Sequence, residues 1–232
     1  MIVRLPSQPI NKSAEARLFP ALYAILDATP DLSSESTLSF AEKLVSAGVE
    51  LIQLRAKNLS PRQFHELSRD LTLRLASHPV RVIVNDRPDI AAMVGAHGVH
   101  VGQEDLPVAD ARKICPPPQW VGVSTHNLEQ LRAADLTSAD YIAVGPVFPT
   151  ATKENPDPVV GIEFLRAARK ITRKPLVAIG GITVQSAGEV FRAGADSVAA
   201  ISDLFLARDP AQRAGDYLAI AKQAMAVRSN AK

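Results

Sequence analysis

The sequence lacks the features that mark a secreted, disulfide-linked or zinc-stabilised protein. Cys115 is the single cysteine in the chain of 232 residues. One thiol excludes an intramolecular disulfide and supplies too few thiolates for a structural zinc site. Residues 1–17 scatter charges and prolines among apolar residues, with no apolar segment of signal-peptide length. We therefore expect a cytoplasmic protein.

Long hydrophobic runs and an excess of one charge are also missing. No apolar run approaches the roughly 20 residues that a membrane-spanning helix needs, so we expect no membrane partner. The chain has 26 Lys and Arg against 24 Asp and Glu, a formal net charge of +2, without a long run of like charge. Because a nucleic-acid surface needs clustered basic residues, no nucleic-acid partner is expected. Small anionic ligands remain open, as does a homo-oligomer.

From residue 22 onward the sequence repeats one pattern, in which a short apolar run is followed by an amphipathic segment. The runs are rich in β-branched residues and cover residues 22–27, 50–55, 81–86, 98–102, 120–125, 141–146, 175–181 and 197–202. Continuous apolar runs are typical of strands that are buried on both faces. Helices between successive strands require parallel pairing with crossover connections.

Helix signals fall between these runs. Segment 38–47 ends at Gly48, and Ser60 precedes Pro61 as an N-cap precedes a first-turn proline. A last helix is expected near 209–226. Eight strand–helix units in a chain of this length predict an α/β protein, a (β/α)8 TIM barrel of parallel strands. A doubly wound open sheet is the alternative, but it usually has fewer strands, and its fingerprint G-x-G-x-x-G is absent.

The domain organisation follows from this pattern. Hydrophobic residues make up 47% of the chain, enough for one large core. We expect residues 1–20 to form a loose leader and residues 21–232 to form a single catalytic barrel domain.

Polar and charged residues gather at the expected carboxyl ends of the strands, where barrels of this kind carry their chemistry. The amino ends of the same strands have mostly small or apolar residues. The residues at the carboxyl ends include Gln53, Arg55, Lys57, Asn85, Asp86, Asp105, Ser124, His126, Thr150, Thr152, Lys153, Gly181 and Ser202. This repeated asymmetry indicates a functional site, since structural needs alone do not produce it.

Gln53, Arg55 and Lys57 are spaced by two residues, so on a strand they project from one face. Arg offers a planar fork of donors and Lys a compact charge, a pair suited to phosphate oxygens. The alternative is a solvated strand end with ordinary ion pairs.

Carboxylates follow the two neighbouring strands. Asp86 stands beside Asn85, and Asp105 follows the next strand along the chain. Hard oxygen ligands beside a cationic cluster indicate Mg²⁺ shared with a substrate diphosphate, because Mg²⁺ usually takes one or two carboxylates plus phosphate oxygens and water. A structural salt bridge, such as Asp86 with Arg55, is the alternative.

Two further segments indicate bound anions, and the second of them indicates a separate phosphate subsite. The loop that holds Thr150, Thr152 and Lys153 places hydroxyls and a cation where simple chain reversal needs only Gly, Asn or Pro. Gly181 and Ser202 follow the seventh and eighth expected strands, whose loops commonly bind a phosphate through backbone N–H groups in such barrels. A tight turn is the alternative meaning of the glycine pair.

For two other titratable residues, a structural role is favoured over a catalytic one. His100 lies within an expected strand, where core packing or exposure is favoured over catalysis, and Asp27 ends the first strand, where a cap or a salt bridge is the default. His126 directly follows a strand end and stays a candidate.

Seven stretches carry a resemblance to a known family. They are QLRAK (53–57), NDRPDIA (85–91), GVHVGQEDLP (98–107), GVSTH (122–126), GPVFPTATK (145–153), VAIGGI (177–182) and the Gly-Ala-Asp before the last strand. Together they resemble the thiamine phosphate synthase family, in the same order and over about residues 21–206. Several motifs, each at a strand end, are far more specific than any one of them.

The resemblance implies an activity and a set of roles. The family joins hydroxymethylpyrimidine diphosphate to hydroxyethylthiazole phosphate, with Mg²⁺ required, and releases pyrophosphate to form thiamin phosphate. It implies that Arg55, Lys57, Ser124 and Lys153 act on the diphosphate as catalytic residues. By position, it assigns Gln53, Arg55, Lys57 and Asn85 to the pyrimidine diphosphate, Asp86 and Asp105 to the metal, and Thr150, Thr152, Gly181, Ile201 and Ser202 to the thiazole phosphate.

The resemblance also implies a dissociative substitution, in which the diphosphate leaves before the thiazole nitrogen attacks. Two departures from the family pattern stand out: Asn58 where many relatives have an acid, and Asp203 next to Ser202. An acid beside a phosphate repels it unless its side chain points away.

Two rival functions remain on the same scaffold. A related barrel protein is a thiazole tautomerase that uses a histidine near the end of the fifth strand and lacks the metal site, which keeps His126 in view. A non-catalytic sensor of phosphorylated ligands is the other, since a fold does not fix a function. The metal carboxylates and the Arg55–Lys57 pair argue against both.

Overall fold

Eight parallel strands close into a barrel in the order of the chain. The computed structural model describes residues 19–150 and 157–230. The strands are β1 (Leu22–Asp27), β2 (Leu51–Arg55), β3 (Arg81–Asn85), β4 (Gly98–Val101), β5 (Trp120–Thr125), β6 (Tyr141–Val144), β7 (Leu176–Ala178) and β8 (Ser197–Ala200). Each lies within one of the eight predicted runs, so the predicted (β/α)8 barrel is confirmed.

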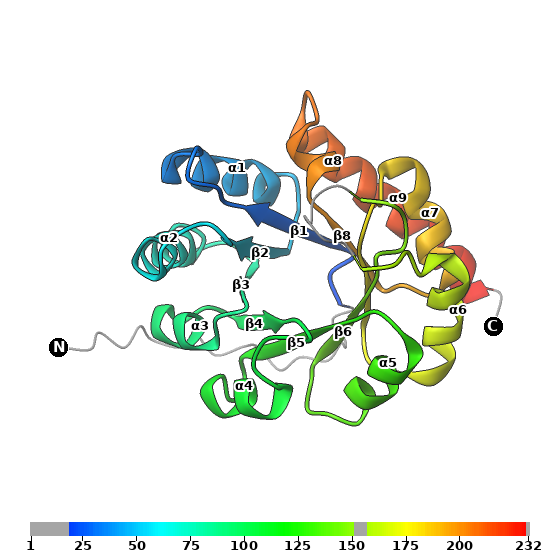
Figure 1. The fold of residues 1–232 in the computed structure, drawn as a ribbon. Coiled ribbons are helices and arrows are strands. Elements are labelled where there is room, and N and C mark those ends of the chain that lie inside the picture. Colours follow the sequence, from blue (N-terminus) through cyan, green and yellow to red (C-terminus); the bar gives the residue numbers. More distant parts are fainter. Residues whose placement is uncertain (1–18, 151–156, 231–232) are drawn as a thin grey trace.

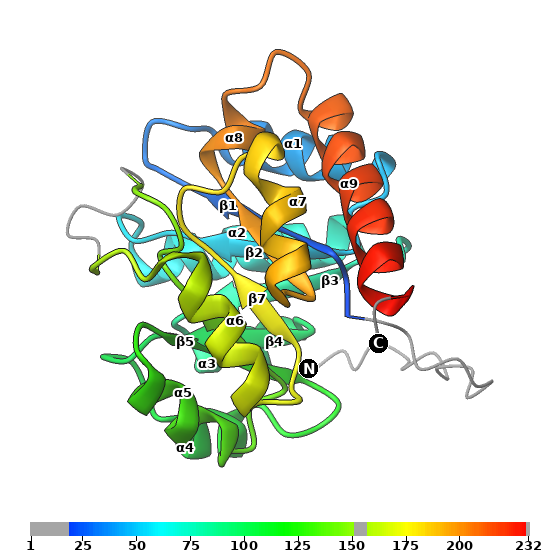
Figure 2. The same ribbon diagram turned by 90° about the vertical axis from the view of Figure 1, so that its right-hand side faces the viewer.

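Helices surround the strands as an outer ring (Figures 1 and 2). They are α1 (Ser34–Ser46), α2 (Pro61–Arg74), α3 (Pro88–Val94), α4 (Val108–Ile114), α5 (Leu128–Asp135), α6 (Gly161–Ile171), α7 (Val184–Ala193), α8 (Ser202–Phe205) and α9 (Pro210–Asn230). The long helix α9 packs beside α7 and α1, and the short α8 precedes it directly after β8. Among the helices that the structure describes, none is long and apolar enough to cross a membrane.

Local sequence signals explain where helices begin. Ser60 caps α2: its side-chain oxygen accepts from the N–H of Gln63, and the Gln63 side chain accepts from the N–H of Ser60 at 3.0 Å. This reciprocal pair satisfies two N–H groups that have no partner within the helix. Helix α1 begins at Ser34, earlier than the predicted residue 38, because Ser33 caps it by accepting from the Ser36 N–H at 3.1 Å.

Strand alternation divides the core into two layers. One apolar cluster lies between the strands and the helices and holds most of the buried side chains, such as Leu22, Ala24 and Leu26 of β1. The other lies inside the barrel and consists of Tyr23, Ile25, Leu51, Ile83, Tyr141, Ala143, Val177 and Ala199. Because side chains two residues apart share a face, Gln53 and Arg55 follow Leu51 on the inner face.

The amino end of the barrel is closed by aromatic rings. Phe19 stacks on Trp120 with ring centroids 5.3 Å apart and lies 5.2 Å from the ring of Tyr141. The guanidinium of Arg81 covers the Trp120 ring at 4.3 Å. Phe19, which the expected leader includes, therefore belongs to the packed barrel.

Candidate active site

The end of β3 holds a carboxylate in an unusual backbone conformation. Asp86 has φ 61°, a left-handed conformation that side chains other than glycine adopt infrequently. Its N–H donates to the carbonyl oxygen of His100 at 2.7 Å, which fixes the turn against β4. Its carboxylate forms an ion pair with Nζ of Lys57. Strained residues of this kind concentrate at functional sites, where the surrounding structure holds them in place.

A second carboxylate lies beside the first. Oδ2 of Asp105 accepts from the N–H of Gly102 at 2.7 Å. The pKa of Asp105 is raised, first by burial and then by the neighbouring carboxylate of Asp86. The two predicted metal ligands therefore meet at one place, as neighbours with like charge.

Arg55 and Lys57 pair with different acids. NH1 of Arg55 lies 2.5 Å from Oδ1 of Asp27, and both side chains are largely buried, with 21% and 25% exposure. Of the two structural roles expected for Asp27, a cap or a salt bridge, the salt bridge is confirmed. The alternative pair of Asp86 with Arg55 is not formed, because Asp27 lies directly opposite Arg55 in the β1–β2 register. Lys57 takes Asp86 instead.

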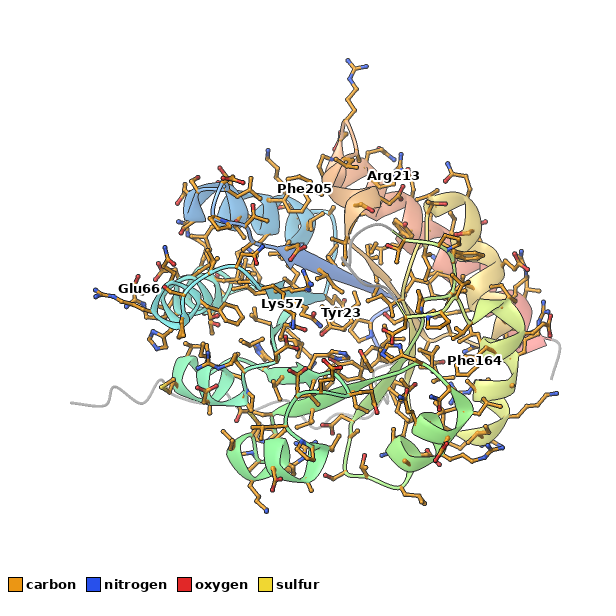
Figure 3. The ribbon with its side chains drawn as sticks, viewed as in Figure 1. Tyr23, Lys57, Glu66, Phe164, Phe205 and Arg213 are labelled. Atoms are coloured by element: carbon orange, nitrogen blue, oxygen red, sulfur yellow. The ribbon has the colours of Figure 1, made fainter. Side chains whose placement is uncertain are left out.

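Three other predicted residues line the barrel below this rim. Gln53 and Asn85 are buried, with 3% and 8% exposure. Ser124 on β5 is partly buried; its Oγ lies 2.9 Å from Nε2 of His100, and its carbonyl accepts from Nε2 of Gln103 at 2.6 Å. In Figure 3, Lys57 lies toward the middle of the barrel, whereas Glu66 and Arg213 lie at its periphery.

The two candidate histidines are placed differently. His126 lies with Nδ1 2.6 Å from the carbonyl oxygen of Gly145 and Nε2 3.5 Å from Asp157. Its backbone N–H donates to the side chain of Gln130 at 2.7 Å. The contact between Nδ1 and Gly145 ties the ends of β5 and β6 together. His100 is buried, as core packing predicts, but its contact with Ser124 was missed. A histidine inside an apolar strand run carries no sequence signal for such a contact.

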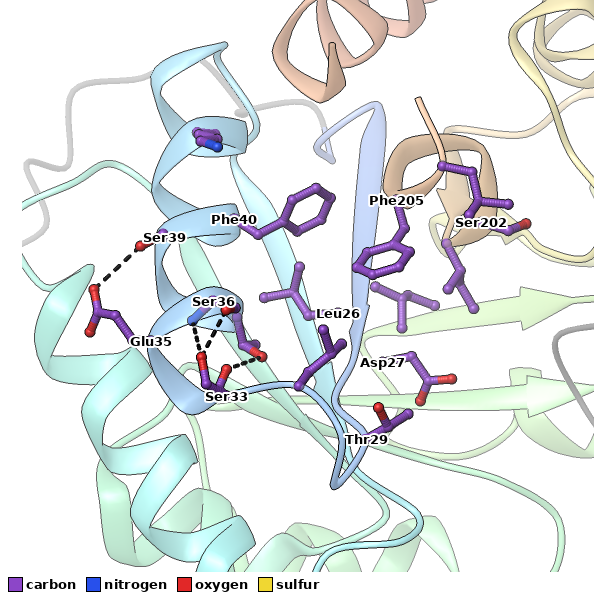
Figure 4. Close-up of a pocket in the computed structure, with 16 residues that line it drawn as sticks. Leu26, Asp27, Thr29, Ser33, Glu35, Ser36, Ser39, Phe40, Ser202 and Phe205 are labelled. Atoms are coloured by element: carbon purple, nitrogen blue, oxygen red, sulfur yellow. Dashed lines mark hydrogen bonds between the residues drawn. The ribbon is translucent and has the colours of Figure 1, made fainter. Parts of the chain in front are cut away.

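A cavity of about 1010 Å³ opens beside the end of β1 (Figure 4). Asp27, Ile201 and Ser202 line one side of it, and helices α1 and α8 contribute Phe40 and Phe205. The last two rings meet edge to face with centroids 5.7 Å apart. Sequence reasoning missed the aromatic wall, because its residues lie in segments far apart in the chain. A smaller cavity of about 180 Å³ is lined by Lys57, Leu59, Phe64, Asn85, Asp86 and other residues.

The loop after β7 requires glycine. Gly181 has φ +61°, and a Cβ on it would lie 2.3 Å from the carbonyl oxygen of Pro149. The loop after β7 is thus pressed against the loop after β6, the loop that carries Thr150. Thr150 is described, whereas Thr152 and Lys153 lie outside the described residues.

Asp203 does not turn toward the expected phosphate subsite. Its carboxylate accepts from NH1 of Arg213 at 2.7 Å and from the hydroxyl of Tyr217 at 2.8 Å. It also accepts from the N–H of Val184 at 3.3 Å. The acid beside Ser202 is therefore neutralised by Arg213 and ties the loops after β7 and β8 together.

The carboxylate pair fits a magnesium ion. Within residues 19–150 and 157–230, no group of three or more His, Cys, Asp or Glu side chains forms a complete metal cage. Two adjacent carboxylates suit a Mg²⁺ site in which substrate phosphates and water supply the other ligands. A dication would offset the burial and the neighbouring Asp86 carboxylate, which together raise the pKa of Asp105.

Comparisons with known proteins identify the family of the chain. The family model described as thiamine monophosphate synthase matches residues 22–204. A thiamine-phosphate synthase of Koribacter versatilis is 50% identical over 204 residues, covering 87% of this chain and 95% of that protein. One from Archaeoglobus fulgidus is 40% identical over 183 residues, covering 79% and 86%.

Solved structures give the same result. The thiamine phosphate pyrophosphorylase of Pyrococcus furiosus superposes with a TM-score of 0.76 at 32% identity, covering 88% of this chain and 96% of that one. A 3-hexulose-6-phosphate synthase, 22% identical with a TM-score of 0.63, shares the fold alone and covers 86% and 99%. Both sequence and structure therefore place the chain in the thiamine monophosphate synthase family.

Proposed function

We propose that this enzyme of thiamin biosynthesis divides the mouth of its barrel between two phosphorylated substrates. It joins hydroxymethylpyrimidine diphosphate to hydroxyethylthiazole phosphate, forming thiamin phosphate and pyrophosphate. The observation that supports the division most strongly is the meeting of Lys57, Asp86 and Asp105 at one rim, with a separate cavity beside Ser202.

The diphosphate subsite lies between β2 and β5. Arg55 and Lys57 supply the positive charge, and Ser124 supplies a hydroxyl donor from the opposite wall. Charge-assisted hydrogen bonds of this kind are about twice as strong as neutral ones. Lys153, predicted for the same role, would add a third cation from the loop after β6. Gln53 and Asn85 lie deeper and hold the pyrimidine ring.

Asp86 and Asp105 hold Mg²⁺ in this proposal. Bound there, Mg²⁺ would neutralise negative charge that develops on the leaving diphosphate. The ion pair between Asp86 and Lys57 places the ammonium next to the metal carboxylates. Lys57 then exchanges part of its pairing with Asp86 for the phosphate oxygens.

The thiazole phosphate subsite lies at the loops after β6, β7 and β8. Its proposed residues are Thr150, Thr152, Gly181, Ile201 and Ser202. Two described features support it: Gly181 brings its backbone close to the loop of Thr150, and Ile201 and Ser202 line the large cavity. Asp203 faces Arg213, so it does not repel a phosphate there.

The chemistry needs no protein nucleophile. The bond between the pyrimidine methylene carbon and the diphosphate oxygen breaks, and the thiazole nitrogen forms a bond to the same carbon. The aminopyrimidine ring stabilises the methylene cation, and the cationic side chains stabilise the departing anion. Holding two reactants in line can supply roughly 7–11 kcal/mol of the barrier.

His126 gives little support to the tautomerase alternative. Its Nδ1 is held by the carbonyl of Gly145, and its Nε2 lies 3.5 Å from Asp157 in the segment after β6. These contacts suit a residue that braces two strand ends. The adjacent carboxylates Asp86 and Asp105 also have no part in a metal-free isomerisation or in a sensor.

The test is direct coupling by the purified chain. The protein is incubated with both phosphorylated substrates and Mg²⁺, and thiamin phosphate and pyrophosphate are measured together. We expect the two products in equal amounts, and none when either substrate or Mg²⁺ is omitted. Absence of thiamin phosphate under these conditions would overturn the proposal.

The cytoplasmic location stays a prediction.

A further inference from the structure

A chain of buried polar side chains crosses the inside of the barrel from β2 to β5. Nε2 of Gln53 lies 2.8 Å from the hydroxyl oxygen of Tyr23, whose ring lies near the middle of the barrel in Figure 3. The hydroxyl oxygens of Tyr23 and Tyr141 lie 2.8 Å apart. His100 completes the chain, with Nδ1 3.1 Å from the Tyr141 oxygen and Nε2 2.9 Å from Oγ of Ser124.

The barrel interior is shaped to hold this chain. Tyr23, Tyr141 and His100 have exposures of 1%, 0% and 7%. Gly122 faces the Tyr141 ring, and a Cβ there would lie 2.0 Å from Cζ of that ring. Tyr141 also stacks on His100 with centroids 5.5 Å apart. Barrel interiors are usually filled by branched apolar residues, so a connected polar layer indicates a role beyond packing.

The chain has two consistent directions of hydrogen bonding, because each hydroxyl donates one hydrogen and a neutral imidazole donates one. His100 is only 7% exposed, and burial of this kind favours the uncharged form of the ring. Gln53 donates to Tyr23. If every buried hydroxyl hydrogen in the chain has an acceptor, Tyr23 then donates to Tyr141, and Tyr141 donates to Nδ1 of His100. The His100 proton then lies on Nε2 and is donated to Ser124.

If the hydrogen bonds run in the reverse direction, the roles of Gln53 and Ser124 both change. It requires the amide of Gln53 to turn over, so that Oε1 accepts from Tyr23. His100 would then carry its proton on Nδ1, and Ser124 would donate to Nε2. A serine whose hydrogen is directed at His100 has none to give to an anion.

We propose that Tyr23, Tyr141 and His100 are positioning residues that form a one-way hydrogen-bond relay between the two ends of the diphosphate subsite. The relay keeps the Ser124 hydroxyl as a donor toward the leaving diphosphate. It also leaves Oε1 of Gln53 as an acceptor toward the pyrimidine ring. This inference rests on the proposed function, which assigns Gln53 and Ser124 to that substrate.

The first test measures the tautomer of His100 without substrate. The protein is labelled with ring-¹⁵N histidine, and the His100 signals are assigned by their loss in His100→Gln. We expect the wild-type ring to be protonated on Nε2 alone. Tyr23→Phe should give a mixture of both tautomers, although it touches neither His100 nor Ser124, because Tyr141 then has no fixed donor.

The control is Ser68→Ala, which removes a fully buried hydroxyl from α2 outside the barrel wall and should leave the tautomer unchanged. Protonation on Nδ1 in the wild type would overturn the relay, and this result does not depend on any variant folding. An unchanged tautomer in folded Tyr23→Phe would also overturn it.

The second test asks whether Tyr23 acts through Ser124. Loss of a hydrogen bond to a charged group predicts that Ser124→Ala lowers kcat/KM for the pyrimidine diphosphate about 10- to 100-fold. The same change should cost less in Tyr23→Phe, where Ser124 has already lost part of its donation, while KM for the thiazole phosphate stays near wild type. Equal losses in both backgrounds would overturn the link.

The two proposals fail in different ways. If the wild type forms no thiamin phosphate, the proposed function is wrong, and the tautomer measurement still tests the relay. If the wild type couples normally but the two substitutions are additive, only the relay is wrong.

Discussion

The two ends of the barrel are built from the same eight strands but hold opposite kinds of residue. At the amino end, Phe19, Trp120 and Arg81 stack into a closed aromatic plug. At the carboxyl end, Asp86 and Asp105 lie side by side next to Lys57. The first arrangement gains free energy of folding from buried apolar area, whereas the second keeps like charges together.

The comparison suggests that the amino end of the barrel mainly stabilises the fold, whereas the carboxyl end carries the candidate site. Site residues are usually held at some cost to stability, because their charges are arranged for a ligand that is absent in the free protein. We therefore expect substitutions at the carboxyl end to lower activity without lowering stability. Substitutions at the amino end should lower stability without lowering activity.

The largest effect is expected at the carboxylate pair. Asp86→Asn and Asp105→Asn should each lower kcat by about 10²–10³, the size seen when one preorganised electrostatic contact is lost. Unfolding in urea should show unchanged or higher stability, because each change removes one of two like charges. Activity within a few-fold of wild type in EDTA would contradict the metal assignment.

The amino end should show the opposite result. Trp120→Ala should lower the free energy of unfolding by about 2–4 kcal/mol, somewhat less than removal of a fully buried aromatic side chain, because Trp120 is only partly buried. kcat/KM of the folded fraction should stay near wild type. Trp120→Phe, which keeps a ring for Phe19 to stack on, is the matched control and should lose less. A large fall in kcat for either variant would break the comparison.

Variants of the two anion subsites sharpen the comparison within the carboxyl end. Lys57→Ala should raise KM for the pyrimidine diphosphate about 10- to 100-fold, as expected for a lost charge-assisted hydrogen bond. Ser202→Ala should raise KM for the thiazole phosphate by about 5- to 10-fold, since it removes a hydroxyl without charge. If both variants affected the same substrate alone, the division into two subsites would be wrong.

Much of the site could be predicted because of one property of the fold. Parallel strands in a closed barrel bring all their carboxyl ends to one rim, so residues far apart in sequence must meet there. Lys57, Asp86 and Asp105 could be placed together on that ground alone. Local rules were equally reliable for the N-cap Ser60, since capping depends on residues only three positions apart.

The remaining contacts could not be predicted, because they depend on strand register and on side-chain packing. The partner of Arg55 is Asp27 because of the β1–β2 register, which no local pattern reveals. Tyr23, Tyr141 and His100 sit in apolar strand runs, and their hydrogen bonds appear only once the barrel closes. The wall formed by Phe40 and Phe205 likewise needs α1 and α8 to be brought together.

The smallest effect is expected at His126, and it separates coupling from isomerisation. A dissociative coupling needs no general base, so His126→Ala should lose only the bracing of β5 against β6 and keep coupling within a few-fold of wild type. A tautomerase must move a proton, and loss of its acid–base group typically costs about 10²–10⁴ in rate. The measurement compares coupling of preformed aromatic thiazole phosphate with isomerisation of its non-aromatic tautomer. Arg55→Ala, which removes a cation from the same rim, should lower coupling far more than His126→Ala does. If the wild type isomerised without coupling, and His126→Ala alone removed that activity, the carboxylate rim would not be the centre of catalysis.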